Sequence, residues 1–126
     1  MALSDTVFVV DDDFSARNGF TRLLRTAGYN VWSFASADEF LGALEPWMHS
    51  CIVLDARMSG MSMEELHSEL QKRDVRLHVI VVTADDDAEM RSQAKRIDAE
   101  AFFRKPVDAK ALLDVIEWAM HSENNH

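Results

Sequence analysis

The sequence predicts an α/β fold in which five strand–helix units build a doubly wound, five-stranded parallel sheet. Two observations indicate this fold. Apolar runs of strand length alternate with helical patterns five times along the 126 residues, and three of these runs are apolar throughout. Strict alternation of strands and helices gives parallel strands joined by right-handed crossovers, with helices on both faces of the sheet. Strands that are covered on both faces are continuously apolar.

The predicted strands are short runs that end at polar residues. They span residues 6–11, 29–34, 50–55, 77–83 and 100–104. The first, third and fourth contain the continuously apolar segments. We therefore expect these three strands at the centre of the sheet, where both faces are buried.

The helices between the strands have their own start and stop signals. Ser36 with Glu39, and Ser62 with Glu65, have the spacing of a capping box. Gly28 follows the first helical pattern as its C-terminal cap. Apolar stripes at helical spacing are Phe20, Leu23, Leu24 and Ala27 in the first helix, and Leu112, Val115, Ile116 and Ala119 in the last.

Polar residues suited to phosphate and metal chemistry stand where four of the strands end. A sheet of five such units favours the flavodoxin-like strand order 2-1-3-4-5, in which strands 1 and 3 are neighbours at the topological switch point. Ligands bind at that point, beyond the carboxyl ends of the strands. We therefore expect Asp11, Asp12 and Asp55 to converge there. Thr83 and Lys105, which end the fourth and fifth strands, would flank them.

Three carboxylates brought together repel one another, so they must take up protons or bind a cation. Oxygen ligands alone favour Mg²⁺, with Mn²⁺ possible. One carboxylate can then attack a phosphoryl group, while Thr83 hydrogen-bonds one phosphoryl oxygen and Lys105 pairs with another. The chain contains neither a Gly-x-x-x-x-Gly-Lys loop nor a Gly-x-Gly-x-x-Gly turn, which disfavours nucleotide and FMN binding.

Composition argues against several other classes of protein. The formal net charge is −9, with 13 basic residues scattered among 22 acidic ones, so nucleic acid is not expected as a direct partner. The single cysteine, Cys51, allows neither an internal disulfide nor a thiolate metal site, and we expect a buried core thiol. The chain has no stretch of about 20 apolar residues and no signal-peptide pattern, so we expect a cytoplasmic protein without membrane contact.

The length corresponds to one domain, which we place at residues 1–121. The polar residues 122–126 are expected to be a tail or the start of a linker. Asp13, the third acid of the first acidic run, is expected to begin the first helix and not to bind metal. Trp32, Trp47 and Trp118 are expected to be partly buried packing residues.

Together these motifs resemble the receiver domain of two-component response regulators, over essentially the full length of the chain. The motifs that carry the resemblance are Val-Val-Asp11-Asp12, Val-Leu-Asp55-Ala-Arg57-Met58, Val-Val-Thr83-Ala84 and Phe102-Phe-Arg-Lys105-Pro106. The resemblance implies a phosphorylation-activated signalling switch. By the same resemblance, the chain would not be an enzyme in the usual sense but a domain that phosphorylates and dephosphorylates itself.

The resemblance also assigns roles to residues. Asp55 would accept a phosphoryl group from a sensor histidine kinase. Asp12, Asp55 and the main-chain carbonyl of Arg57 would bind Mg²⁺ directly, and Asp11 would act mostly through a metal-bound water.

Two further roles concern the conformational switch. Thr83 and Lys105 would contact the phosphoryl group, and Phe102 would be the aromatic switch residue, although an aromatic in the last strand can also be a core residue. The face formed by the fourth helix, fifth strand and fifth helix would then pair in a homodimer or act on an output domain. The Asp-x-Arg-Met stretch resembles regulators of the nitrogen-fixation kind, with a LuxR-type DNA-binding output domain, which would lie outside these 126 residues.

Three alternatives remain open from the sequence: a stand-alone receiver that acts as a diffusible signal or phosphate sink, a pseudo-receiver that acts as a constitutive interaction module, and a metal-dependent phosphohydrolase. The chain also departs from the family's usual pattern. Ser59 replaces a common proline, which is expected to make the loop 57–61 more mobile. Met63 and Asp98 stand where glycines are common, and Asp98 can still adopt a left-handed cap conformation at some cost.

Overall fold

The computed structural model describes residues 5–45, 50–58, 60–85 and 88–122 of the chain. Its elements are β1 (Thr6–Val10), α1 (Phe14–Thr26), β2 (Asn30–Phe34), α2 (Ala37–Ala43), β3 (Ser50–Asp55), α3 (Met63–Lys72), β4 (Leu77–Thr83), α4 (Ala88–Arg96), β5 (Ala101–Arg104) and α5 (Ala109–Ser122). All neighbouring strands are parallel, and their order is β2-β1-β3-β4-β5. The predicted fold class and strand order are confirmed.

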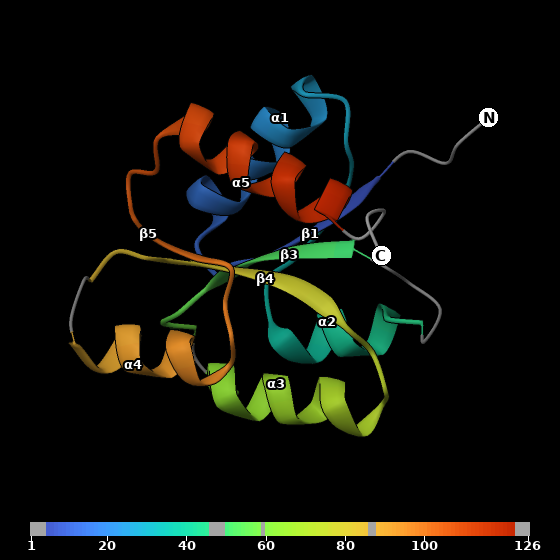
Figure 1. Cartoon of the computed structure of the whole chain (residues 1–126), viewed down its shortest axis with the longest axis vertical. Coiled ribbons are helices and arrows are strands. Elements are labelled where there is room, and N and C mark those ends of the chain that lie inside the picture. Colours follow the sequence, from blue (N-terminus) through green and yellow to red (C-terminus); the bar gives the residue numbers. More distant parts are fainter. Residues whose placement is uncertain (1–4, 46–49, 59, 86–87, 123–126) are drawn as a thin grey trace.

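The sheet separates two layers of helices (Figure 1). Helices α1 and α5 cover one face, and α2, α3 and α4 cover the other. Successive strand residues point to opposite faces, so Val7 and Val9 of β1 join the core under α1 and α5, while Phe8 and Val10 join the core under α2, α3 and α4. The central strand β3 is buried along its whole length. This placement explains why its sequence is apolar without alternation.

Cys51 confirms the prediction of a buried thiol. It lies on β3 in the core under α1 and α5, with none of its surface exposed. Burial raises the pKa of its thiol above the ordinary range, and the nearby charge of Glu100 raises it further. A thiol that keeps its proton is a poor nucleophile and metal ligand. Cys51 is therefore a packing residue.

Local capping signals fix where several helices begin and end. Ser62 accepts a hydrogen bond from the main chain of Glu65, whose side chain accepts one from Ser62, so the predicted capping box is complete. Ser36 accepts from the main chain of Glu39, but the Glu39 carboxylate accepts from Ala35 instead of Ser36. The second capping box is therefore only half formed.

Left-handed residues terminate three of the segments that precede strands, at Gly28, Asp74 and Asp98. Gly28 has φ +100° directly after the C-cap of α1, a conformation that glycine adopts without a steric cost. Asp98 has φ +56° before β5. Met63 is buried at the start of α3, and Met58 packs against the same core. Ser59 lies outside the described residues, so the prediction for its loop stays a prediction.

Two further predictions concern the surface; the prediction for Trp47 falls outside the described residues. Trp32 is 40% exposed and makes an edge-to-face contact with Phe8, but Trp118 on α5 is 61% exposed, so the prediction of partial burial is wrong for Trp118. Within the described part of the chain, none of the helices has the length and apolar character needed to cross a membrane.

Candidate functional site

The switch point between β1 and β3 brings three carboxylates together. One carboxylate oxygen from each of Asp11, Asp12 and Asp55 lies within 4.8 Å of the others. Asp11 is 1% exposed and Asp55 is 6% exposed, whereas Asp12 lies at the surface. The predicted convergence is therefore confirmed, and the cluster has two buried members and one open to solvent.

Lys105 supplies a positive charge to this cluster from the end of β5. Its Nζ lies 2.8 Å from Asp11 Oδ2 and 3.7 Å from Asp55 Oδ2. The main-chain N–H of Lys105 donates to the carbonyl of Thr83 at 2.8 Å, which extends the pairing of β4 with β5 to the site. One ammonium thus faces two buried carboxylates, so the site retains an excess of negative charge.

This excess changes the acidity of the groups involved. Burial, followed by the charge of Asp11, raises the pKa of Asp55 to about 6, although the Arg57 N–H and the charge of Lys105 act in the opposite direction. Burial by itself would lower the pKa of Lys105, but its hydrogen bond to Asp11 and the charge of Asp55 outweigh burial and raise it. At neutral pH we therefore expect Lys105 to be charged and Asp55 to be largely ionised.

Asp11 is held by contacts that the sequence analysis did not identify. The main-chain N–H of Asp13 donates to Asp11 Oδ1 at 2.9 Å, and the Arg17 guanidinium donates to the Asp11 carbonyl at 2.7 Å. Thr21 in turn donates to the carbonyl of Arg17 at 2.8 Å. Asp13 occupies the N-cap position of α1, as predicted. The first turns of α1 therefore hold the acidic loop in place.

Thr83 is buried beside the cluster, with its hydroxyl engaged in its own loop. Its Oγ1 donates to the carbonyl of Asp85 at 3.0 Å and accepts from the N–H of Asp85 at 3.1 Å. Thr83 follows Val82, which is the register partner of Asp55. The Thr83 hydroxyl on β4 therefore lies one register position beyond Asp55 on the neighbouring strand β3.

The loops after β3 and β4 are joined by an ion pair. Arg57 Nε lies 2.9 Å from Asp85 Oδ2, and both side chains are exposed. The main-chain N–H of Arg57 also donates to Asp55 Oδ1 at 3.2 Å. No sequence pattern predicts this ion pair, because its partners are 28 residues apart in the numbering and become neighbours only through the pairing of β3 with β4.

Phe102 lies apart from the acidic cluster, on β5. It pairs in register with Val81, two residues before Thr83. Its side chain is partly buried against the core under α2, α3 and α4, and it lines a groove of about 380 Å³ between α4 and β5. We call this the α4–β5 groove; Arg91 and Lys95 also line it.

The donor set of the cluster fits a small hard cation. Carboxylate oxygens are the ligands that Mg²⁺ prefers, and Mg²⁺ usually keeps several waters when one or two carboxylates bind it. The exposed position of Asp12 leaves one side of the cluster open to solvent. The negative charge of the carboxylates exceeds the single positive charge of Lys105, and this excess favours a divalent cation at the cluster.

Comparisons with known proteins agree with this arrangement. Residues 7–117 match the family model of the response regulator receiver domain. The chain is 39% identical over 117 residues to the transcriptional regulatory protein TdiR of Thauera aromatica, covering 93% of this chain and 52% of that protein. It is 37% identical over 110 residues to nodulation protein W of Bradyrhizobium diazoefficiens, covering 87% of this chain and 48% of that protein. The chain thus spans about half the length of these curated relatives.

The fold is also similar to that of solved response regulator structures. The response regulator StyR superposes with a TM-score of 0.86 at 41% identity, covering 98% of this chain and 63% of that one. The crystal structure titled FixJ-N superposes with a TM-score of 0.83 at 31% identity, covering 95% of this chain and 97% of that one.

Proposed function

The chain belongs to the response regulator receiver domains, and from this premise we propose that it is a two-component signalling switch in which Asp55 accepts a phosphoryl group from a sensor histidine kinase. The observation that carries the proposal is the position of Asp55. Its carboxylate is buried at the end of the central strand, with two further carboxylates within 4.8 Å and the Lys105 ammonium 3.7 Å away.

The transfer requires Asp55 as a nucleophile. One of its carboxylate oxygens attacks the phosphorus of the phosphohistidine, a P–O bond forms, and the P–N bond breaks as the imidazole leaves with the electron pair. Because the pKa of Asp55 is about 6, most of the group is ionised at pH 7 and ready to attack. Lys105 would pair with a phosphoryl oxygen as a point charge.

We propose that Mg²⁺, or Mn²⁺ in its place, occupies the acidic cluster. Asp11, Asp12 and Asp55 would hold the ion together with the main-chain carbonyl of Arg57. When bound, the ion neutralises charge that develops on the phosphoryl oxygens. The chain's own part is to hold the acidic residues in place: the Asp13 N–H donates to the Asp11 carboxylate, and Arg17 donates to the Asp11 main-chain carbonyl.

The phosphoryl group would change the conformation through Thr83 and Phe102. To reach a phosphoryl oxygen, the Thr83 hydroxyl has to give up its two hydrogen bonds to Asp85. Phe102, two register positions away on the neighbouring strand, would then turn inward. The face made by α4, β5 and α5 would change as a population shift between two conformations.

We further propose that this face controls an output domain that binds DNA, or forms a homodimer. The relative TdiR is named a transcriptional regulatory protein, and so are the FixJ proteins of Azorhizobium caulinodans and Bradyrhizobium diazoefficiens. The net charge of −9 makes direct contact between this segment and DNA unfavourable. The receiver would therefore act on transcription through its partner domain.

Mass spectrometry tests the phosphoacceptor directly. The protein is incubated with a small phosphodonor and Mg²⁺, and one phosphoryl group should add about 80 Da. Asp55→Asn should abolish the adduct, whereas Asp13→Asn, which removes a neighbouring exposed carboxylate, should keep it. An unmodified wild-type protein, or an undiminished adduct on Asp55→Asn, would contradict the proposal.

A further inference from the structure

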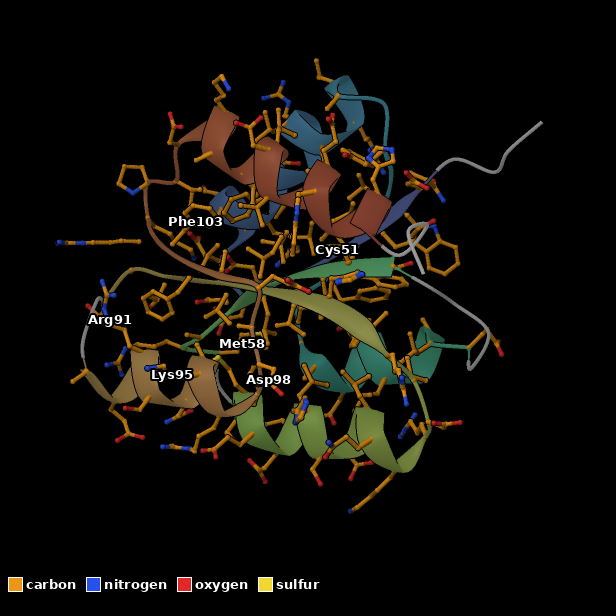
Figure 2. All side chains as sticks on the ribbon, in the orientation of Figure 1. Cys51, Met58, Arg91, Lys95, Asp98 and Phe103 are labelled. Carbon is orange, nitrogen blue, oxygen red and sulfur yellow. The ribbon has the colours of Figure 1, made fainter. Side chains whose placement is uncertain are left out.

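Two consecutive aromatic residues of β5 lie in different surroundings. Successive strand residues point to opposite faces of a sheet. Phe103 packs against the core under α1 and α5, and Figure 2 shows it on that side of the sheet. Phe102 packs against the opposite core and borders the α4–β5 groove. Phe102 therefore has an open space beside its ring.

Arg91 covers the ring of Phe102 from α4. The centre of its guanidinium group lies 5.1 Å from the ring centroid. This distance falls within the range of a cation–π contact. Figure 2 shows Arg91 and Lys95 together on α4, on the far side of the sheet from Phe103.

The helix that carries Arg91 is itself fixed against the core. Met90 and Ala94, on either side of Arg91 in the helix, are buried in the core under α2, α3 and α4. Arg96 at the end of α4 binds Glu64 of α3 through two hydrogen bonds, of 3.0 and 3.3 Å. The guanidinium therefore approaches the ring from a supported position.

We propose that Arg91 is a positioning residue for the switch: its guanidinium restrains Phe102 in the α4–β5 groove, so that conversion to the phosphorylated conformation has to break this contact. The inference rests on the proposed function, because it concerns the regulation of the same site. A contact present in only one of two conformations shifts their ratio by its own interaction energy. For an exposed cation–π pair this shift is about two- to fivefold.

The experiment compares three variants with wild type. Arg91→Met removes the charge but keeps a long side chain, and Arg91→Lys keeps a charge with a weaker ring contact. Lys95→Met is the matched control, because it removes the same charge from the same groove one helical turn away. The initial rate of phosphorylation by a small phosphodonor with Mg²⁺ should rise about two- to fivefold in Arg91→Met. The rate should rise less in Arg91→Lys. In Lys95→Met it should stay close to the wild-type rate.

A second readout does not depend on phosphorylation. Incorporation of fluorophenylalanine labels the seven phenylalanines, and Phe102→Leu identifies the ¹⁹F resonance of Phe102. That resonance should shift in Arg91→Met and stay in place in Lys95→Met. Thermal unfolding of each variant confirms that it is folded.

The outcomes separate the two proposals. Equal rates and an unchanged Phe102 resonance in Arg91→Met would overturn the restraint, and so would identical effects of Arg91→Met and Lys95→Met. A wild-type protein that takes no phosphoryl group would overturn the proposed function instead. The resonance alone then decides the restraint: a shift specific to Arg91→Met supports it, and no shift overturns it.

Discussion

The carboxyl group of Asp55 is held where its charge is costly. Burial and the neighbouring Asp11 raise its pKa from the ordinary value of 3.8 to about 6. Between these two values the folded protein binds more protons than the unfolded chain does. Stability that depends on this group is therefore lost as the pH rises from about 4 to about 6. The ionised Asp55 carboxylate, which the reaction needs as its nucleophile, therefore lowers the stability of the folded protein.

We predict that Asp55→Asn stabilises the metal-free protein at neutral pH. The gain should be small near pH 4 and reach about 1 to 3 kcal/mol at pH 7, because one pKa unit corresponds to about 1.4 kcal/mol. Urea unfolding in the presence of a chelator, at several pH values, measures it. Asp13→Asn controls for the loss of one negative charge. A difference between Asp55→Asn and wild type that does not vary between pH 4 and pH 7 would contradict the assigned pKa.

Lys105 is the second residue whose removal has a defined effect. We predict that Lys105→Met destabilises the metal-free protein by about 3 kcal/mol, because breaking a buried pair leaves an uncompensated charge. Asp11, the partner left behind, is only 1% exposed. Mg²⁺ should recover part of the loss by supplying positive charge at the same place, as measured by urea unfolding with and without the ion.

The matched control for this prediction is Lys110→Met. Lys110 pairs with Asp114 at 2.9 Å on the exposed side of α5, and exposed pairs contribute little to stability. This variant should leave the unfolding free energy nearly unchanged. Equal losses for Lys105→Met and Lys110→Met would show that the Lys105 pair does not act as a buried one.

For single residues, the sequence predicted where the functional side chains lie better than it predicted which groups they contact. The convergence of Asp11, Asp12 and Asp55 followed from strand order alone, because parallel strands end at one edge of the sheet. The hydrogen bond between Lys105 and Asp11 joins residues 94 positions apart and depends on side-chain packing. Trp118 was predicted wrongly, although it lies outside the apolar stripe of its helix, a pattern that indicates exposure.

Among the secondary-structure elements, α3 begins with a complete capping box. We predict that Ser62→Ala costs about 1 kcal/mol of stability, the usual effect of losing an N-cap side chain. Because Ser62 and Glu65 bond reciprocally, the effect of Ser62→Ala should be smaller in a Glu65→Ala background. A double-mutant cycle by urea unfolding measures the coupling. Additive effects would show that the two hydrogen bonds act independently.

The elements themselves were predictable to within about a residue for a physical reason. Strands covered on both faces leave an apolar run that ends where burial ends, so β3 and β4 have the predicted bounds. β1 ends one residue earlier than predicted, and β2 and β5 each begin one residue later, because the pairing of strands decides the terminal residues and the composition does not. Asp11 illustrates this: it lies beyond β1, yet its N–H still donates to Phe34 at 3.1 Å.

For the molecule as a whole, the sheet connects the site to a distant face. The acidic cluster lies at the ends of β1 and β3, while the α4–β5 groove lies beyond β4. Thr83, the last residue of β4, lies between them. It pairs in register with Arg104 of β5, two residues after Phe102. A change at the cluster can therefore reach the groove through one strand and its neighbour.

Binding of Mg²⁺ to the cluster should stabilise the whole fold, since an ion that binds only the folded state adds free energy that grows with its concentration. At 100 times the dissociation constant the gain is about 2.7 kcal/mol. We predict that the midpoint of thermal unfolding rises with Mg²⁺ in wild type and rises much less in Asp12→Asn. Asp12 is the informative position because it is exposed, so its substitution removes a ligand without leaving a buried charge unpaired.

Asp13→Asn removes a neighbouring exposed carboxylate outside the cluster and should keep the full Mg²⁺ effect, while NaCl at equal ionic strength controls for screening. If Asp12→Asn and Asp13→Asn respond to Mg²⁺ alike, the stabilisation comes from general surface charge, and the cluster is not the metal site.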